Sequence, residues 1–345
     1  MYKSEDHRWP LVSGLVLLWG MQFLSLPASA QGISIHERWN TVGSESTVLI
    51  AYIAGMVEAP DGSIWVSEGL GNDRLIFEIS ARGVPTRVVA GSGDGPGEVA
   101  NPRRMAQRPG GGIAIYDASH IAVELFDASG EFERRVRLSE RVTNQKGFAV
   151  LPSGDFVLSG GVRTNPYALH QFDPDGQLVA EWREIPDTKN PRAAVMTAGG
   201  PVVAVADGSI LFSRAAPHEI VRYSDSGIKA DVVATNPDLL EPIGDDFIHE
   251  TGSGASLHRT FSWNFPQSRG IFKLPDGNVL NVVWFLDDGI SLWQVYTPQG
   301  DLVASQRIAR AYEPWALARN GDIIASYRDP TTGVHHAVRL TLEVR

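Results

Sequence analysis

One recurring pattern constrains the fold of this chain more than any other feature. An apolar run leads into a glycine-centred turn, and a second apolar run follows. The six copies are MVEAPDGSIWVSE, MAQRPGGGIAIYD, FAVLPSGDFVLSG, VVAVADGSILFSR, IFKLPDGNVLNVV and WALARNGDIIASY, with turn glycines Gly62, Gly111, Gly154, Gly208, Gly277 and Gly321. The residues six before and two after each glycine are apolar in every copy. This pattern predicts six β-hairpins with their apolar positions facing inward.

A second glycine turn follows the first by 19–23 residues in five of the copies. Its sequences are SARG, DASG, DPDG, SDSG and TPQG, ending at Gly83, Gly130, Gly176, Gly227 and Gly300. Each copy therefore holds four strands in about 40–45 residues, the size of one propeller blade. We predict an all-β, six-bladed β-propeller in residues 31–345. The predicted blades are 47–98, 99–139, 140–189, 190–236, 258–308 and 309–345.

The sixth copy lacks a fourth strand, because the sequence ends at RLTLEVR after the third one. The segment ISIHERWN, residues 33–40, is left over near the other end of the chain. We predict that it pairs with the last strand, closes the ring and removes a free sheet edge. The alternative is a loose segment that belongs to no blade.

Residues 237–263 are surplus to the fourth copy, and they include five acidic residues beside apolar pairs. Long insertions in repeat folds leave from loops, where extra length costs little entropy. This insertion is either a solvated surface loop or a lid over one face of the ring.

Residues 1–30 have the pattern of a secretory signal peptide. An apolar run from Leu11 to Leu26 precedes the small residues Ala28, Ser29 and Ala30. An uncleaved anchor is the alternative, but about 16 apolar residues are short for a membrane span. We therefore expect an exported protein, periplasmic or extracellular.

Composition excludes several classes of function. The formal net charge of −10 argues against nucleic acid and against an anionic membrane surface. The absence of cysteine excludes disulfides, an acylated cysteine and thiolate metal sites. Serine-elbow, P-loop, HExxH and CxxC motifs are also missing from the sequence.

Two stretches carry a resemblance to known repeats. GDGPGEVANPRRMA followed by GIAIYDASHIAVELFDASGEF resembles an NHL repeat, and APDGSIWVSEGLGNDRLIFEIS is similar to repeats of streptogramin (virginiamycin B) lyase. The resemblance implies a propeller fold, but these motifs specify strands and turns rather than activity. The lyase likeness would imply a histidine–glutamate pair with magnesium. Glu68 matches the glutamate element, but no histidine falls in a matching motif, and the calcium-site motifs of gluconolactonase-like propellers are absent.

In a propeller, the innermost strands all begin at one mouth of the central channel. Here they begin with Arg103 and Arg104, Lys146, Arg269 and Glu313. Guanidinium groups suit carboxylate or phosphate recognition, so we predict an anionic ligand at this mouth. The alternative is that these cations pair with carboxylates of neighbouring blades.

The loops between second and third strands open on the same face and supply further candidates. For ligand binding these are Glu68, Asp117 and His120; Asp117 has the alternative of accepting bonds from backbone amides of its own loop. His120, His218 and His335 lie in comparable loops of alternate blades and are candidate ligands for a divalent cation, calcium or magnesium. Ordinary solvated histidines are the alternative. The same loops also contain Asn72, Asp73, Arg74, Arg163, Asn165, Arg214, Asp287, Asp288, Arg328 and Asp329.

Two functions remain open from the sequence. The first is a non-catalytic binding module for a protein, peptide, glycan or small anionic ligand. The second is a metal-dependent lyase or lactonase on the same scaffold. No cofactor is firmly implied, and we expect a monomer, because a closed ring leaves no strand edge to pair.

Overall fold

The computed structural model places most of the predicted propeller. It describes residues 31–41, 50–69, 74–162, 166–185, 199–214, 218–224, 229–235, 248–251, 258–261, 267–285, 289–310 and 312–345. Residues 31–345 form one compact unit. The predicted signal peptide and most of the predicted insertion lie outside the described residues. Within the described residues, no helix has the length and apolar character needed to cross a membrane.

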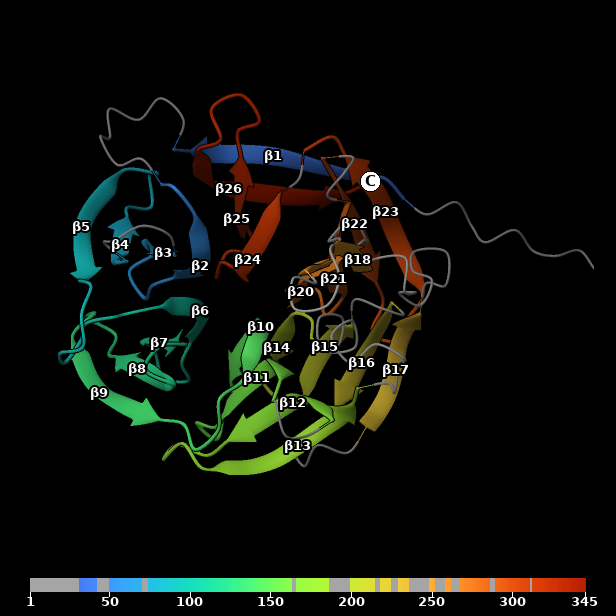
Figure 1. The fold of residues 1–345 in the computed structure, drawn as a ribbon. Helices are drawn as coiled ribbons and strands as arrows, with labels where there is room; N and C mark the ends of the chain where they lie inside the picture. Colours follow the sequence, from blue (N-terminus) through green and yellow to red (C-terminus); the bar gives the residue numbers. More distant parts are fainter. Residues whose placement is uncertain are drawn as a thin grey trace, which may run out of the picture. The chain divides into compact units, whose positions relative to one another are not determined.

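Six antiparallel sheets of four strands surround a common axis (Figure 1), which confirms the predicted fold. The first three blades run from the innermost strand outward, and each is built from consecutive strands. Blade 1 holds β2 (Ile53–Glu58), β3 (Ile64–Glu68), β4 (Ile76–Ile79) and β5 (Pro85–Ala90). Blade 2 holds β6 (Pro102–Gln107), β7 (Ile113–Asp117), β8 (Ala122–Phe126) and β9 (Phe132–Arg137). Blade 3 holds β10 (Thr143–Val150), β11 (Phe156–Gly161), β12 (Tyr167–Phe172) and β13 (Leu178–Glu184).

The other three blades follow the same plan, and the last one takes a strand from the start of the described chain. Blade 4 holds β14 (Val202–Ala204), β15 (Ile210–Arg214), β16 (Glu219–Tyr223) and β17 (Lys229–Thr235). Blade 5 holds β20 (Gln267–Lys273), β21 (Val279–Phe285), β22 (Ile290–Tyr296) and β23 (Leu302–Ile308). Blade 6 holds β24 (Glu313–Leu317), β25 (Ile323–Arg328), β26 (His335–Val344) and β1 (Ile33–Asn40).

Strand β1 closes the ring as predicted. It pairs antiparallel with β26 from Ile33 opposite Val344 to Asn40 opposite Val338. A bulge between Glu37 and Trp39 adjusts the register midway. The free edge of β26 is thereby covered by a strand about 300 residues away in sequence.

The predicted turn glycines adopt the backbone conformation that favours glycine. All six have φ between 84° and 98°, in the left-handed region that other residues avoid. Each donates its N–H to the carbonyl three residues earlier, as Gly62 does to Ala59 at 3.0 Å. The hairpin between the first two strands of every blade is therefore specified by local chemistry.

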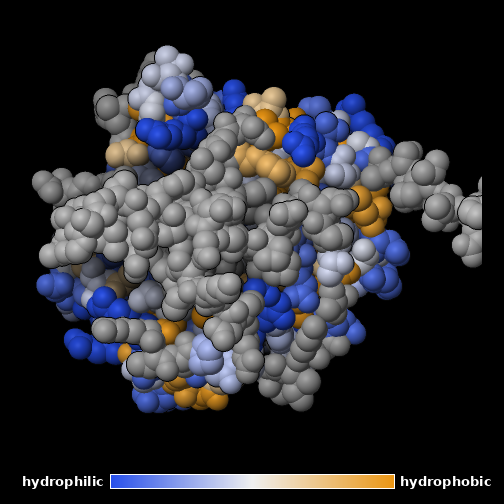
Figure 2. Space-filling view, turned by 45° about the vertical axis from the view of Figure 1, so that its right-hand side comes forward, coloured by the Kyte–Doolittle hydropathy of each residue, from blue (hydrophilic) through white to orange (hydrophobic). Residues whose placement is uncertain are grey.

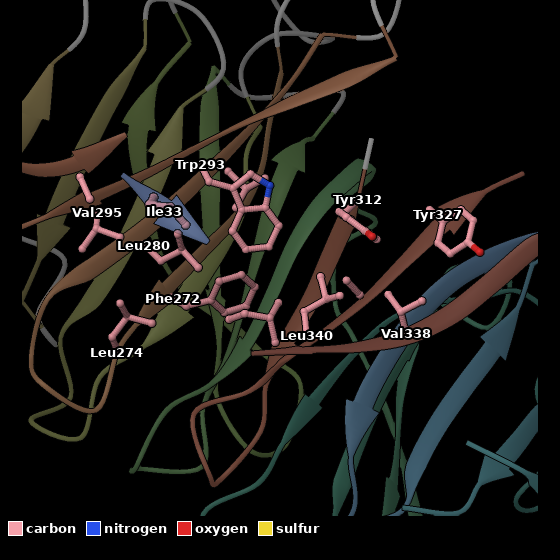
Figure 3. Close-up of a cluster of buried hydrophobic side chains, with 14 residues drawn as sticks. Ile33, Phe272, Leu274, Leu280, Trp293, Val295, Tyr312, Tyr327, Val338 and Leu340 are labelled. Carbon is pink, nitrogen blue, oxygen red and sulfur yellow. The ribbon is translucent and has the colours of Figure 1, made fainter. Parts of the chain in front are cut away.

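The hydrophobic core is divided among the six interfaces between neighbouring blades. Of the twelve apolar positions that flank the turn glycines in the repeat, eleven are buried and Trp315 is partly exposed. Figure 3 shows the cluster between blades 5 and 6, where Phe272, Leu280 and Trp293 approach Val338 and Leu340. Ile33 of β1 belongs to this cluster, so ring closure also buries apolar surface.

The outer surface carries few large apolar side chains. Those exposed among the described residues are Val84, Val88, Val179, Leu302 and Val344. In Figure 2 hydrophobic residues of the described surface form scattered patches among hydrophilic ones. Scattered apolar residues of this kind are normal and do not mark an interface.

Within the predicted insertion, two strands are described. They are β18 (Ile248–Thr251) and β19 (His258–Phe261), which pair antiparallel outside the six blades. The choice between a surface loop and a lid concerns residues that lie mostly outside the described part of the chain.

Candidate functional site

A polar cavity of 620 Å³ opens where the innermost strands begin. The cations among its described lining residues are Arg103, Arg104, Arg141, Lys146 and Arg269. None of the described lining residues is acidic. The structure therefore brings together the four cations that the sequence suggested for the channel mouth, and it adds Arg141.

Breaks in the strand register occur at three of these cations. The pairing of β6 with β7 skips Arg103, and the pairing of β20 with β21 skips Arg269. In β10 the register breaks between Thr143 and Gly147, so Lys146 also falls in an irregular segment. Bulges re-aim side chains and are common next to functional sites. These three bulges interrupt the strands at the level of the cavity.

The segment before Lys146 departs further from regular strand geometry. Asn144 has φ of 53°, in the left-handed region, which asparagine tolerates better than most residues. The Arg104 guanidinium donates from Nη2 to the carbonyl of Gln145 at 3.2 Å. Blades 2 and 3 are thus joined at the cavity wall by a bond that holds one of its cations.

The guanidinium groups of Arg104 and Arg269 each stack on a tryptophan. Arg104 lies 5.1 Å from the ring centroid of Trp315, and Arg269 lies 4.9 Å from that of Trp284. Within the described part of the chain, the buried Nε atoms of both arginines have no hydrogen-bond partner. Stacking on the tryptophan rings fixes the planes of the two guanidinium groups at the cavity wall.

One carboxylate lies beside this group of cations. Glu313, at the start of β24, is buried and accepts from Arg269 Nη1 at 3.4 Å. This pair agrees with the alternative reading of the sequence for Arg269. It leaves the charge of the mouth strongly positive, because five cations line the cavity.

Burial and mutual repulsion act on the cations of the mouth. Burial, together with the charges of Arg269 and Arg104, lowers the pKa of Lys146 to about 7. Burial likewise lowers the pKa of Arg104, although the charge of Glu313 opposes this shift. A bound anion would relieve both costs, because it replaces lost hydration and offsets the repulsion.

A simple offset connects these residues to the repeat. The residues eight before the six turn glycines are Ala54, Arg103, Lys146, Gly200, Arg269 and Glu313. Four of the six are charged, and three of those four are cations lining the cavity. Arg141 lies outside this register, in the connection from β9 to β10, so the repeat offers no signal for it.

Glu68, Asp117 and His120 are held by other partners, and none of them lines the cavity. Glu68 Oε1 accepts from the backbone N–H of Ala51 at 3.0 Å. Asp117 is fully buried and accepts from the amides of Ala100 and Asn101 at 2.6 and 3.0 Å. Its other oxygen accepts from the amides of Ser119 and His120 at 2.9 and 3.1 Å, as the alternative of bonding to its own loop predicts.

His120 belongs to a cluster of carboxylates on the outer side of the same loop. Its Nε2 is 2.9 Å from Asp94 Oδ1, and its Nδ1 is 3.2 Å from Glu124 Oε1. Arg135 donates to the same Glu124 oxygen at 2.5 Å. His120 is therefore not part of the cavity lining at the channel mouth.

The other two candidate histidines have separate surroundings. His218 is buried, its Nε2 lies 2.8 Å from Asn281 Nδ2, and burial lowers its pKa to about 4. His335 packs edge-on against Tyr52 at 5.5 Å. Among the described residues no group of three or more histidine and acidic side chains is arranged to hold a metal ion.

Some of the remaining loop candidates are among the described residues, and others are not. Asn72, Asp73, Arg163, Asn165, Asp287 and Asp288 lie outside the described residues. Arg74 donates to the carbonyl of Ala100 at 2.9 Å, and Arg328 donates to that of Gly333 at 3.1 Å. Arg214 is buried, and burial lowers its pKa to about 10. None of these three described arginines lines the cavity.

Fold and site together define a class: a six-bladed β-propeller with a cationic channel mouth. Solved structures with the same fold are numerous. A member of the DUF4221 family from Bacteroides vulgatus is similar with a TM-score of 0.60 and 7% identity, covering 92% of this chain and all of that one. A Bacteroides fragilis protein described as exported has a TM-score of 0.58 at 9% identity, covering 93% and 97%.

Virginiamycin B lyase from Staphylococcus aureus is also similar. Its TM-score is 0.51 at 13% identity, and the match covers 90% of this chain and 99% of that one. At such identities the likeness shows the fold alone. No protein-family model and no curated protein matches the sequence.

Proposed function

We propose that this protein is an exported propeller that binds a small anionic ligand, a carboxylate or phosphate, at the mouth of its channel. One observation carries the proposal: five cations line a cavity whose described lining contains no acid, in a chain of net charge −10. A buried excess of positive charge destabilises a fold, so a ligand that neutralises this excess is a reason for keeping it. The apolar run of residues 11–26 and the exported neighbour support export.

The role proposed is binding rather than catalysis. An oxyanion is recognised by several N–H donors converging on one point, and guanidinium groups supply them in a fixed plane. The guanidinium groups of Arg104 and Arg269 and the amine of Lys146 are the donors proposed here. The three histidines, which are the usual proton-transfer groups, lie outside the cavity lining.

Isothermal titration calorimetry with inorganic phosphate and with citrate, at low ionic strength and below pH 7, tests the proposal. Lys146→Met should weaken binding by about tenfold or more, because a hydrogen bond to a charged group is lost. Arg82→Met is the control, since Arg82 is exposed in the turn between β4 and β5 and lines neither the mouth nor the cavities below it. Its affinity should stay within about twofold of the parent protein, as for other surface changes.

Two results would contradict the proposal. The first is that neither anion binds the parent protein. The second is that Lys146→Met and Arg82→Met lose affinity equally, which would show general attraction to positive charge instead of a site at the mouth.

A further inference from the structure

Below the cations the channel narrows to an apolar ring. The residues six before the turn glycines meet there, one from each blade: Met56, Met105, Phe148, Val202, Ile271 and Trp315. All are apolar, and all except Trp315 are buried. The throat has a volume of only 50 Å³, about the share of one or two water molecules in the liquid.

Cavities above and below the throat share its walls. Arg104, Lys146 and Arg269 line both the mouth and the throat. Met105, Phe148 and Val202 line both the throat and a third cavity of 510 Å³ at the other end of the channel. The described lining of that third cavity is mostly aliphatic and aromatic; its charged members are Arg108 and Lys273, and it contains no acid. The channel therefore has a cationic mouth and a mostly apolar lower cavity, joined by a constriction.

We propose that the ligand is a linear-chain carboxylate, with its head at the cations of the mouth and its alkyl chain through the throat. This inference rests on the proposed function and specifies its ligand class. Charge complementarity places the carboxylate beside Arg104, Lys146 and Arg269. The small throat volume selects an unbranched chain, because a ring or a branched group exceeds it.

The side chains of the throat suit this occupant. Met56 and Met105 are flexible and fill irregular space around an apolar chain. Phe148 and Trp315 offer rigid apolar surfaces to the same chain. A polyanion without an apolar part would use the mouth alone and would leave the apolar surface of the lower cavity in contact with water.

A chain-length series tests the inference. Calorimetry would compare acetate, hexanoate, octanoate and decanoate at concentrations where each is monomeric. Each CH₂ that enters the channel should tighten the Kd by up to about fourfold, the value expected for transfer of one methylene from water. Octanol, which has the chain without the charge, should bind at least about tenfold more weakly than octanoate.

Val202→Phe tests whether the chain passes through the throat. The larger side chain should close the constriction, so octanoate and decanoate should bind no better than acetate, while phosphate binding is unchanged. Val84→Phe, on the exposed turn before β5, is the matched control and should keep the full chain-length dependence. Circular dichroism and thermal unfolding establish that both variants are folded; if Val202→Phe is not, the chain-length series decides alone.

The outcomes separate this inference from the function on which it rests. If phosphate and acetate bind but affinity does not grow with chain length, the inference is overturned and anion binding stands. If affinity grows with chain length in the parent protein and equally in Val202→Phe, the chain binds elsewhere and the inference is again overturned. If neither phosphate nor any of the carboxylates binds, the proposed function is overturned, and the inference falls with it.

Discussion

Two clusters of buried charge in this molecule have similar residues and opposite balance. The first lies where blade 6 meets blade 1. Arg339 donates to Glu58 Oε1 at 2.9 Å and to Asp322 Oδ2 at 3.0 Å. Burial raises the pKa of Asp322, but hydrogen bonds from Thr341, Asn320 and Arg339 outweigh it and keep that pKa below its ordinary value. We call this the joint cluster.

At the channel mouth, cations outnumber acids among the described residues. Five cations line the cavity, and Glu313 is the carboxylate paired with one of them. The joint cluster places one cation against two acids: the bond to Asp322 lies within blade 6, and the bond to Glu58 joins blade 6 to blade 1. The difference separates two uses of buried charge: opposite charges bonded to one another hold the ring together, and an excess of cations along a cavity is suited to an anionic ligand.

Replacing the cation of the joint cluster should have the largest effect. Arg339→Met leaves Glu58 and Asp322 buried without their partner, and the expected loss is about 3–5 kcal/mol in the free energy of unfolding. Urea unfolding followed by circular dichroism measures it. Arg339→Lys, which keeps the charge but loses the two-sided geometry, should lie between the parent and the methionine variant. A loss below about 1 kcal/mol would mean that the joint cluster contributes little to closure.

Removing a cation from the mouth should have the opposite sign. Lys146→Met replaces an amine that burial and two arginine charges disfavour, so the ligand-free protein should gain about 0.5–2 kcal/mol of stability. The same urea titration at neutral pH measures the gain. If this variant is destabilised as Arg339→Met is, the mouth is structural and the contrast between the two clusters disappears.

The pH dependence should distinguish the clusters further. The pKa of Lys146 is about 7 in the folded protein and 10.5 in the reference state. Between these values the unfolded chain holds a proton that the folded protein lacks, so stability rises with pH across this window. The stability advantage of Lys146→Met should therefore shrink as pH increases above 7, and anion affinity of the parent should fall. A constant difference between the two proteins from pH 7 to about 10 would refute this assignment.

A surface pair provides the smallest effect and a baseline for the others. Arg345 lies 3.4 Å from Glu343, and the two side chains are 65% and 51% exposed. Arg345→Gln should change the unfolding free energy by less than about 0.5 kcal/mol, because exposed pairs are screened by water and salt. A larger effect would show that charge in general, and not burial, sets the differences described above.

The fold could be predicted because its determinants are local and repeated. A glycine with positive φ at each of six turns, and apolar residues at fixed offsets from it, identify the hairpins without knowledge of tertiary contacts. The closing strand could be predicted by counting, because one blade lacked a strand and residues 33–40 had no blade. The β18–β19 hairpin could not be predicted in this way, since it lies outside the repeat.

The site was predictable only where it follows the repeat. Arg103, Lys146 and Arg269 occupy one offset from the turn glycine, and topology brings that offset to the channel mouth. The three bulges at the cavity depend on how the inner strands pack around the channel axis. The local sequence pattern does not indicate this packing. Because tertiary packing is not visible in the local sequence, nothing there indicates Arg141 as a lining residue. It also does not show that Asp117 and His120, which are candidates for ligand binding, have partners within the protein.

Closure by β1 and β26 has a consequence for biosynthesis. The residues that meet in the sixth blade are separated by about 300 positions, so a polypeptide emerging from the ribosome cannot complete its ring until β26 has been made. Five blades can form in order as they appear, but β1 must wait unpaired for its distant partner. The sixth blade and the closed ring are therefore the last parts of the propeller to form.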